Sequence, residues 1–182
     1  VSALLVDRQG SLWIGTDRRL RRLRDGVLET LSTREALPAG NVTALLEDHE
    51  GNLWVATTRG LARLRDGSIV TYSKFQGLSS DEVLTVAPAR GGGLWVGSDD
   101  GRIDRLLEGT ASGVPARELG GSRVLALLED GEGRLWAGTD RGLSVRAGGE
   151  WTPFTQGLPR AAVRSLLQDR TGALWVGTEQ GL

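Results

Sequence analysis

A five-residue string that begins with Leu-Trp recurs five times along this chain of 182 residues. Successive tryptophans of the strings lie 41, 41, 41 and 39 residues apart, so five of the six tryptophans share one register. A fixed period of this length indicates a repeat architecture, because each unit buries its apolar face only against its neighbours. The strings are Leu12–Thr16, Leu53–Thr57, Leu94–Ser98, Leu135–Thr139 and Leu174–Thr178.

The second repeat shows what one unit contains. Its short apolar or β-branched segments are separated by turns rich in glycine, aspartate and asparagine, and such segments predict β-strands. Across the whole chain, 27 glycines and only 5 prolines supply these turns. Four strands per repeat are therefore predicted. In the second repeat they cover residues 42–46, 53–57, 60–64 and 68–72.

Four antiparallel strands every ~40 residues are typical of a β-propeller, in which each repeat forms one blade around a common axis. Helical repeats are excluded, because glycine interrupts every stretch long enough for a helix pair. The sequence thus predicts an all-β fold with four blades and half of a fifth, as one part of a larger ring. The predicted repeats are 1–41, 42–82, 83–123, 124–162 and the half repeat 163–182.

The half repeat predicts an open edge. If the first strand of each unit is innermost, residues 163–182 supply only the two inner strands of a fifth blade. An unpaired sheet edge favours association with another strand. We therefore expect the remaining blades, or a second copy of the chain, to pack at this edge.

The Leu-Trp strand is expected in the middle of each blade, where both of its faces are covered and an unbroken apolar run is favoured. The tryptophan then has a structural role, because its large ring fills the gap between neighbouring sheets. Replacing one by alanine should cost about 3 to 5 kcal/mol, and less in the half repeat. The predicted structural residues are Trp13, Trp54, Trp95, Trp136 and Trp175.

Composition excludes several classes of site and partner. The chain has no cysteine, which excludes disulfides, thiol catalysis and cysteine-based metal sites. Its net charge of −1 gives none of the electrostatic signature expected of a nucleic-acid-binding protein. No apolar run approaches the ~18 residues needed to cross a bilayer, so direct membrane insertion of this segment is not expected. No cofactor is predicted.

The Asp-x-x-Gly turns that follow the first strands place acidic residues at Asp7, Asp48, Asp130 and Asp169. Calcium needs about six to eight convergent oxygens, and one such turn offers too few. The favoured interpretation is that each aspartate accepts hydrogen bonds from its own turn and that the glycine adopts a positive φ. No metal site is predicted.

Candidate ligand-binding residues are expected in two sets of loops at one end of the blades, because side chains there can vary without disturbing the strands. Arginines in these loops would suit a sugar that carries carboxylate or sulfate groups. The alternative is that they are ordinary solvated loop residues. The turn after the Leu-Trp strand contributes Arg18, Arg59, Asp100, Arg141 and Gln180, and the loop before the next first strand ends at Asn41, Glu82, Arg123 and Ala162.

The order of motifs within the unit resembles the two-component regulator propeller repeat: a valine strand, Asp-x-x-Gly, Leu-Trp-Val/Ile-Gly-Thr and Gly-Leu. Residues 124–143 read VLALLEDGEGRLWAGTDRGL. Some positions depart from this pattern. Arg19 replaces the glycine of Gly-Leu in the first repeat. In the third, Arg102 replaces the leucine and Ala89 replaces the aspartate, so the third repeat is the most degenerate.

The resemblance implies a sensory role. Such repeats form the periplasmic or extracytoplasmic part of membrane-spanning sensor histidine kinases, including hybrid two-component systems, and many of these respond to products of polysaccharide breakdown. On this basis the expected function is ligand sensing in signal transduction, with oligosaccharides as expected ligands. The family usually builds rings larger than this chain supplies.

Two other functions remain open. The first is a protein-interaction propeller that binds no small molecule. The second is an enzyme similar to the streptogramin lyases, propellers that carry out base-assisted elimination at a magnesium site and use histidine as the base. His49 is the only histidine, and we expect it at the opposite end of the blades from the candidate loops. We therefore assign no catalytic residue and expect no enzyme activity.

Overall fold

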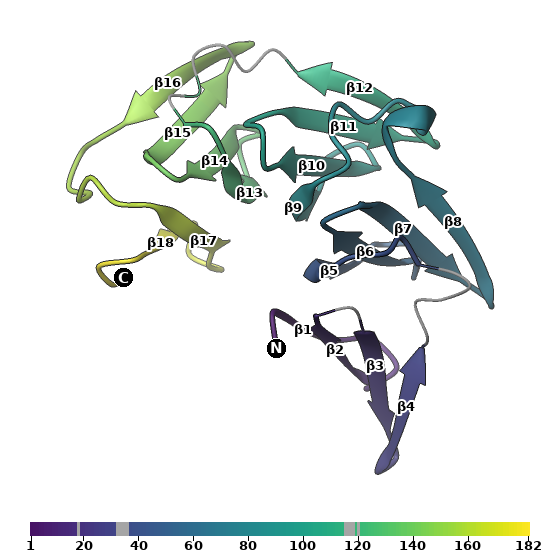
Figure 1. The fold of residues 1–182 in the computed structure, drawn as a ribbon. Helices are drawn as coiled ribbons and strands as arrows, with labels where there is room; N and C mark the ends of the chain where they lie inside the picture. Colours follow the sequence, from purple (N-terminus) through teal and green to yellow (C-terminus); the bar gives the residue numbers. More distant parts are fainter. Residues whose placement is uncertain (18, 32–36, 115–118, 120) are drawn as a thin grey trace.

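The computed structural model describes residues 1–17, 19–31, 37–114, 119 and 121–182, which form an open arc of five antiparallel sheets (Figure 1). Four sheets have four strands, and the last has two. The first two blades contain β1 (Ala3–Val6), β2 (Leu12–Thr16), β3 (Arg19–Arg24), β4 (Val27–Leu31), β5 (Val42–Glu47), β6 (Leu53–Thr57), β7 (Gly60–Arg65) and β8 (Ser68–Tyr72). The others contain β9 (Val83–Pro88), β10 (Leu94–Ser98), β11 (Ile103–Leu107), β12 (Thr110–Val114), β13 (Val124–Glu129), β14 (Leu135–Thr139), β15 (Gly142–Ala147), β16 (Glu150–Phe154), β17 (Val163–Gln168) and β18 (Leu174–Thr178).

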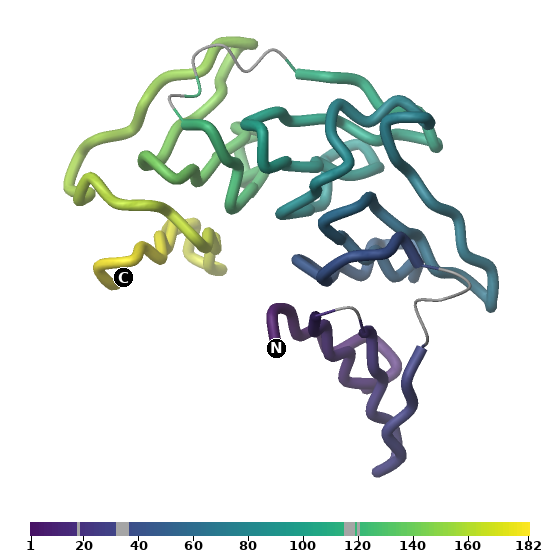
Figure 2. Tube along the Cα trace, viewed as in Figure 1, coloured from purple at the N-terminus to yellow at the C-terminus, as the bar shows by residue number. Residues whose placement is uncertain are grey.

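The strands of each sheet follow one another in chain order. The first strands, β1, β5, β9, β13 and β17, lie on the inner side of the arc, and β4, β8, β12 and β16 lie outermost (Figure 1). The two chain ends face each other across the open part of the arc (Figure 2). The predicted propeller class, with a fifth blade of only two strands, is confirmed. Outside the strands, Lys74–Gln76 forms a 3₁₀ turn, η1.

Burial explains why the Leu-Trp strand is the most similar segment among the repeats. All residues of β6, β10 and β14 are buried, because a neighbouring blade covers each face. In β2 buried and half-buried residues alternate, since a described neighbouring blade covers only one of its faces. Trp54 is 5% exposed, whereas Trp175 is 47% exposed. The difference arises because β17 and β18 have neither outer strands nor a following blade among the described residues.

A small residue sets the distance between blades. A Cβ built on Gly97 would lie 2.6 Å from Cγ1 of Val124, the first residue of the next inner strand. A Cβ on Gly138 would lie equally close to Cγ1 of Val163, at 2.6 Å. Such contacts leave no room for a methyl group unless a neighbour moves. This glycine therefore makes room for the first strand of the next blade.

The third blade requires a correction. The sequence comparison placed Arg102 at the leucine of Gly-Leu, but this alignment is wrong, because the turn between β10 and β11 contains one extra residue. Ile103 pairs with Gly97 as Leu61 pairs with Ala56 in the second blade, and both Ile103 and Leu61 are fully buried. The apolar position is therefore retained, and Arg102 lies in the exposed turn.

Candidate functional site

The strands of every blade are connected at two opposite faces of the arc, and the connections differ between these faces. The turn face carries the Asp-x-x-Gly turns and the tight turns between third and fourth strands, such as Asp66-Gly67. The loop face carries the turns between second and third strands and the longer loops that lead into the next blade, such as residues 73–82. The candidate ligand-binding residues all belong to the loop face, except that Arg18 lies outside the described residues.

The turn after the Leu-Trp strand is held by the threonine that ends the strand. Thr139 Oγ1 accepts the backbone N–H of Arg141 at 3.1 Å and donates to the carbonyl of Gly142 at 3.0 Å. Thr57 holds Arg59 with the same two bonds, also at 3.1 and 3.0 Å. Because the threonine fixes the backbone, the turn presents its arginine without help from the arginine side chain.

The two predicted loop sets lie beside each other in each blade. The N–H of Thr58 donates to the carbonyl of Asn41 at 3.1 Å, and the N–H of Asn41 donates back to Thr58 Oγ1 at 3.1 Å. The same backbone bond recurs in the later blades. It joins Asp99 to Glu82 at 3.0 Å, Asp140 to Arg123 at 3.4 Å and Glu179 to Ala162 at 3.2 Å.

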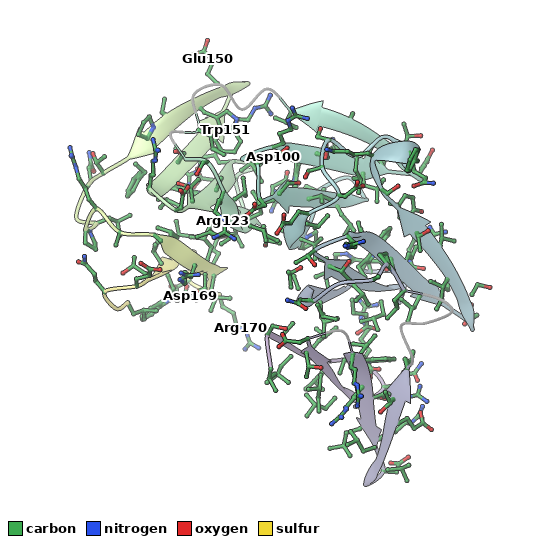
Figure 3. The ribbon with its side chains drawn as sticks, in the orientation of Figure 1. Asp100, Arg123, Glu150, Trp151, Asp169 and Arg170 are labelled. Carbon is green, nitrogen blue, oxygen red and sulfur yellow. The ribbon has the colours of Figure 1, made fainter. Side chains whose placement is uncertain are left out.

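Several charges on this face are neutralised by close partners. Arg123 Nε lies 2.5 Å from Asp99 Oδ1, which joins the fourth blade to the third. Asp100 pairs with Arg102 of its own turn at 3.5 Å. Figure 3 labels Asp100 and Arg123 on these two neighbouring blades. Both candidate residues thus already have an ionic partner within the protein.

Asp140 also stabilises the loop before the fourth blade. Its carboxylate accepts hydrogen bonds from the hydroxyl and N–H of Ser122 and from the N–H of Arg123, at 2.8 to 3.0 Å. Burial alone would raise the pKa of Asp140, but these hydrogen bonds outweigh it and leave the pKa below its usual value of 3.8. The aspartate is therefore ionised at neutral pH and holds the loop next to its turn.

A cavity of about 420 Å³ opens on the loop face where the fourth blade meets the fifth. The turn after β14 contributes Arg141, and the loop after β16 contributes Arg160. Leu143, Phe154 and Leu158 supply much of its apolar wall, and no carboxylate is among the described lining residues. Among the described residues, neither arginine forms an ion pair. The cavity thus combines an apolar wall with two arginines that have no ionic partner among the described residues.

Of the predicted ligand-binding residues, only Arg141 lines this cavity. Asn41, Arg59, Asp100, Arg123 and Gln180 lie on the same face but are not among its lining residues. Arg160 was missed by the sequence analysis, which considered only the last residue of each long loop. The string Leu158-Pro159-Arg160 was the available signal, because leucine anchors the loop in the cavity and proline stiffens the backbone next to the arginine.

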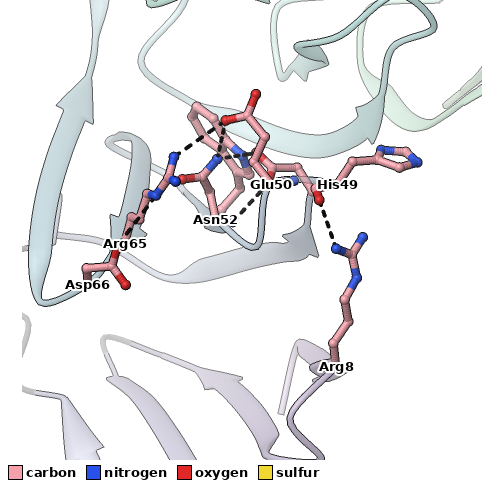
Figure 4. A network of polar contacts seen from close by, with 8 residues as sticks. Arg8, His49, Glu50, Asn52, Arg65 and Asp66 are labelled. Atoms are coloured by element: carbon pink, nitrogen blue, oxygen red, sulfur yellow. Dashed lines mark hydrogen bonds and ion pairs between the residues drawn. The ribbon is translucent and has the colours of Figure 1, made fainter.

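His49 lies on the turn face, at the opposite end from the cavity. It occupies the turn between β5 and β6, and its backbone carbonyl accepts a hydrogen bond from Arg8 Nη1 at 2.9 Å (Figure 4). Within the described part of the chain, no three His, Cys, Asp or Glu side chains are grouped as a metal site would require. The described residues also contain no helix that is both long and apolar enough to cross a membrane.

Comparisons with known proteins agree with this geometry. The family model for the two component regulator propeller matches residues 1–18, 36–59, 118–141 and 157–180, which lie in the first, second, fourth and fifth repeats. No curated protein matches the chain in sequence.

Three solved structures illustrate the similarity of fold. One is described as the extracellular domain of a hybrid two component system of B. thetaiotaomicron (TM-score 0.87, 21% identity, 100% of this chain, 28% of that chain). A second is the extracellular domain of a one component system of the same organism (TM-score 0.83, 20% identity, 98% of this chain, 26% of that chain). The third is virginiamycin B lyase of Staphylococcus aureus (TM-score 0.81, 17% identity, 100% of this chain, 67% of that chain).

At these identities the structural matches establish the propeller fold and nothing further. The chain spans less than a third of the length of the two sensor domains, at 28% and 26%. The assignment to a family rests instead on the sequence repeat. Four matched segments share the Leu-Trp strand and its flanking turns, and the blades repeat the same strand order and spacing. The chain belongs to the two component regulator propeller family.

Proposed function

We propose that the chain is part of an extracytoplasmic ligand-sensing propeller in a two-component signalling protein, and that its loop face binds an acidic oligosaccharide. The observation that carries the ligand class is the cavity lined by Arg141 and Arg160. Their guanidinium groups, which form no ion pair with another described residue, can each form paired hydrogen bonds with a carboxylate or sulfate. The apolar wall formed by Phe154 and Leu158 suits the hydrophobic face of a sugar ring.

Titration calorimetry with trigalacturonate tests this ligand class, with the uncharged trisaccharide maltotriose as the comparison. We expect binding of trigalacturonate only, and a loss of roughly tenfold in affinity for either Arg141→Ala or Arg160→Ala. Arg170→Ala is the matched control, because Arg170 is an exposed arginine of the turn face (Figure 3). Equal binding of the two sugars, or an equal loss in the control, would contradict the proposal.

The sensory role has a separate test in the parent gene. The coding sequence beyond Leu182 should encode a membrane-spanning segment followed by a histidine kinase. Further blades followed by a stop codon, with no spanning segment, would favour the protein-interaction propeller instead.

The end faces of the arc support a second proposal, that further blades pack against them. Leu4 and Val6 on the first blade are 62% and 65% exposed, and Leu167 on the fifth is 61% exposed. The equivalents of Leu4 in the middle of the arc, such as Leu45, pack into the core between blades. Exposed apolar faces of this kind mark protein contacts.

Small-angle scattering of the isolated chain at rising concentration tests this second proposal. We expect association that the double variant Leu4→Asp/Leu167→Asp abolishes. A chain that stays monomeric at high concentration would count against a strong contact at these faces.

A non-enzymatic role is part of the first proposal. A histidine-to-alanine variant of the S. aureus lyase is described as catalytically inactive, so that enzyme depends on a histidine. The only histidine here, His49, lies on the turn face, away from the proposed ligand cavity. We expect no turnover of quinupristin with or without magnesium, and any activity that His49→Ala abolished would overturn this part.

A further inference from the structure

A second cavity, of about 410 Å³, lies between the first and second blades on the turn face. Its aliphatic lining consists of Leu31, Leu53, Leu64 and Ile69, one from each of four strands, β4, β6, β7 and β8, and Trp13 also lines it. Leu53 is buried, and the other three are half-buried. The cavity is therefore a groove with an aliphatic floor between two complete blades.

The position of this groove is explained by two differences between junctions. Tyr72 pairs with Leu61 as Leu31 pairs with Leu20, so Tyr72 is the equivalent of Leu31 at the next junction. The Tyr72 ring packs against Trp54 with centroids 5.7 Å apart. Val70 likewise stands where the first blade has Glu29. The first junction thus has a smaller side chain on its floor and an additional carboxylate on its wall.

The charges of the described residues around the groove do not balance. Four carboxylates and two arginines of the described part of the chain line it. Both arginines are already paired: Arg22 with Glu29 at 2.7 Å, and Arg65 with Asp66 at 3.6 Å. Arg65 also reaches Glu50 at 3.6 Å, beside the groove (Figure 4).

The excess negative charge belongs to Asp7 and Glu47, which form no ion pair among the described residues. Asp7 accepts the indole N–H of Trp13 at 2.8 Å, and Glu47 accepts the backbone N–H of Arg8 at 2.8 Å. These neutral donors fix the carboxylates in place without cancelling their charge. The groove thus presents a negative end beside its aliphatic floor.

We propose that this groove docks a short cationic segment of a partner protein, in which a lysine or arginine alternates with aliphatic residues. The hydrocarbon stem of the basic residue would lie over the leucines of the floor, as such stems do on apolar surfaces. Its charged head would meet Asp7 and Glu47, and an adjacent aliphatic side chain would cover Ile69. Charge complementarity selects the cationic partner, and the aliphatic floor selects a peptide over a small inorganic cation.

The test is fluorescence anisotropy with a fluorescein-labelled hexapeptide of alternating lysine and leucine, titrated with the whole chain. A glutamate–leucine hexapeptide is the charge-reversed comparison. We expect binding of the lysine peptide only, weakened at least about tenfold in the Glu47→Gln/Asp66→Asn variant. The matched control is Glu108→Gln/Glu150→Gln, which removes two exposed carboxylates beside the corresponding turns of the third and fourth blades, outside the groove.

A steric variant separates occupation of the groove from a general effect of charge. Ser68 lines the groove and is exposed, so Ser68→Trp should obstruct it and abolish binding. Thr110→Trp, at the first residue of β12, should leave binding unchanged. Thermal melts of all variants confirm that they fold. The proposal is overturned if both peptides bind equally, if the groove variants bind like their controls, or if spermidine displaces the peptide at equal concentration.

Discussion

The indole N–H of Trp95 donates to Glu129 Oε2 at 2.6 Å, and this carboxylate belongs to the next blade. In the other four repeats the indole donates to the aspartate of its own turn, as Trp54 does to Asp48 at 2.7 Å. The third repeat has Ala89 at that position. Glu129 Oε2 also accepts the backbone N–H of Arg90 at 2.9 Å. In the degenerate repeat, the indole N–H of the tryptophan thus finds its hydrogen-bond acceptor in the neighbouring blade.

Glu129→Leu should therefore destabilise the chain by about 1 to 3 kcal/mol, because it leaves two donors at the blade junction without an acceptor. Ala89→Asp should restore much of the loss, since the turn at Ala89 makes the same two backbone hydrogen bonds as the turn at Asp48. Urea unfolding of the single and double variants measures both effects. If Ala89→Asp restored no stability to the Glu129→Leu variant, the loss could not be attributed to the unpaired indole N–H.

Trp136→Ala should cost about 3 to 5 kcal/mol, because the ring is buried between two blades and a cavity would replace it. Trp175→Ala should cost clearly less, since this ring is 47% exposed. Thermal unfolding monitored by circular dichroism compares the two variants. Equal losses would mean that the fifth blade is covered in solution by another chain.

Gly97→Ala should destabilise the chain by about 1 to 3 kcal/mol through overpacking. The added methyl would lie 2.6 Å from Val124 Cγ1 and 2.7 Å from Thr85 Cγ2. Val124→Ala should relieve part of that strain, so the double variant should lose less than the sum of the two single losses. The reverse change at the corresponding residue of the second blade, Ala56→Gly, is the control and should show no such coupling with Val124.

Acid stability should depend on the aspartates that accept indole hydrogen bonds. Burial alone would raise the pKa of Asp130, but hydrogen bonds from Trp136, Arg134 and Glu132 outweigh it and lower the pKa from 3.8 to about 2. The unfolded chain therefore takes up the proton first as the pH falls. The stabilisation is fully present above the unfolded pKa of 3.8 and is lost as the pH falls toward about 2.

Denaturant unfolding between pH 6 and the acid limit tests this dependence. Asp130→Asn should be less stable at pH 6 and should lose less stability on acidification than the parent chain. Asp17→Asn, in an exposed turn, should follow the parent curve. A parallel acid profile for the Asp130 variant would show that this carboxylate does not contribute to the acid transition.

The fold could be predicted because its main signal is local and repeated. Each Leu-Trp string marks a middle strand, and the turn residues between strands need only their own backbone to form. The extra residue at Asp99–Arg102 could not be placed, because a residue lost from the following loop restores the period of 41. Spacing alone does not show an insertion that is compensated within one repeat.

Side-chain contacts between neighbouring strands of one blade were less accessible to sequence reasoning. Arg22, Arg63 and Arg105 lie over Trp13, Trp54 and Trp95, with 5.5 to 5.8 Å from guanidinium carbon to ring centroid. Each arginine is the cross-strand neighbour of its tryptophan. An arginine nine or ten residues after each of these tryptophans was the available signal.

The candidate cavity could be recognised only from the folded structure. Arg141 was predicted from its turn, but its pairing with Arg160 depends on how the loop after β16 folds back over the fourth blade. Single-residue reasoning also could not show that Arg123 is already bound to Asp99. Whether a loop arginine is free or neutralised is decided by residues about 20 positions away in the chain.

The valine-to-glycine contact between blades makes the two ends of the arc different from each other. Val42, Val124 and Val163 each enter the space above the glycine of the preceding blade. At one end Val1, the first residue of the same pattern, is 84% exposed, and at the other the three atoms nearest to a Cβ built on Gly177 all belong to Ser165 of its own blade. One end of the arc thus presents the valine of this contact, and the other end presents the glycine. Two like ends cannot mate through this contact, so any assembly that uses it must grow head to tail with every unit facing the same way.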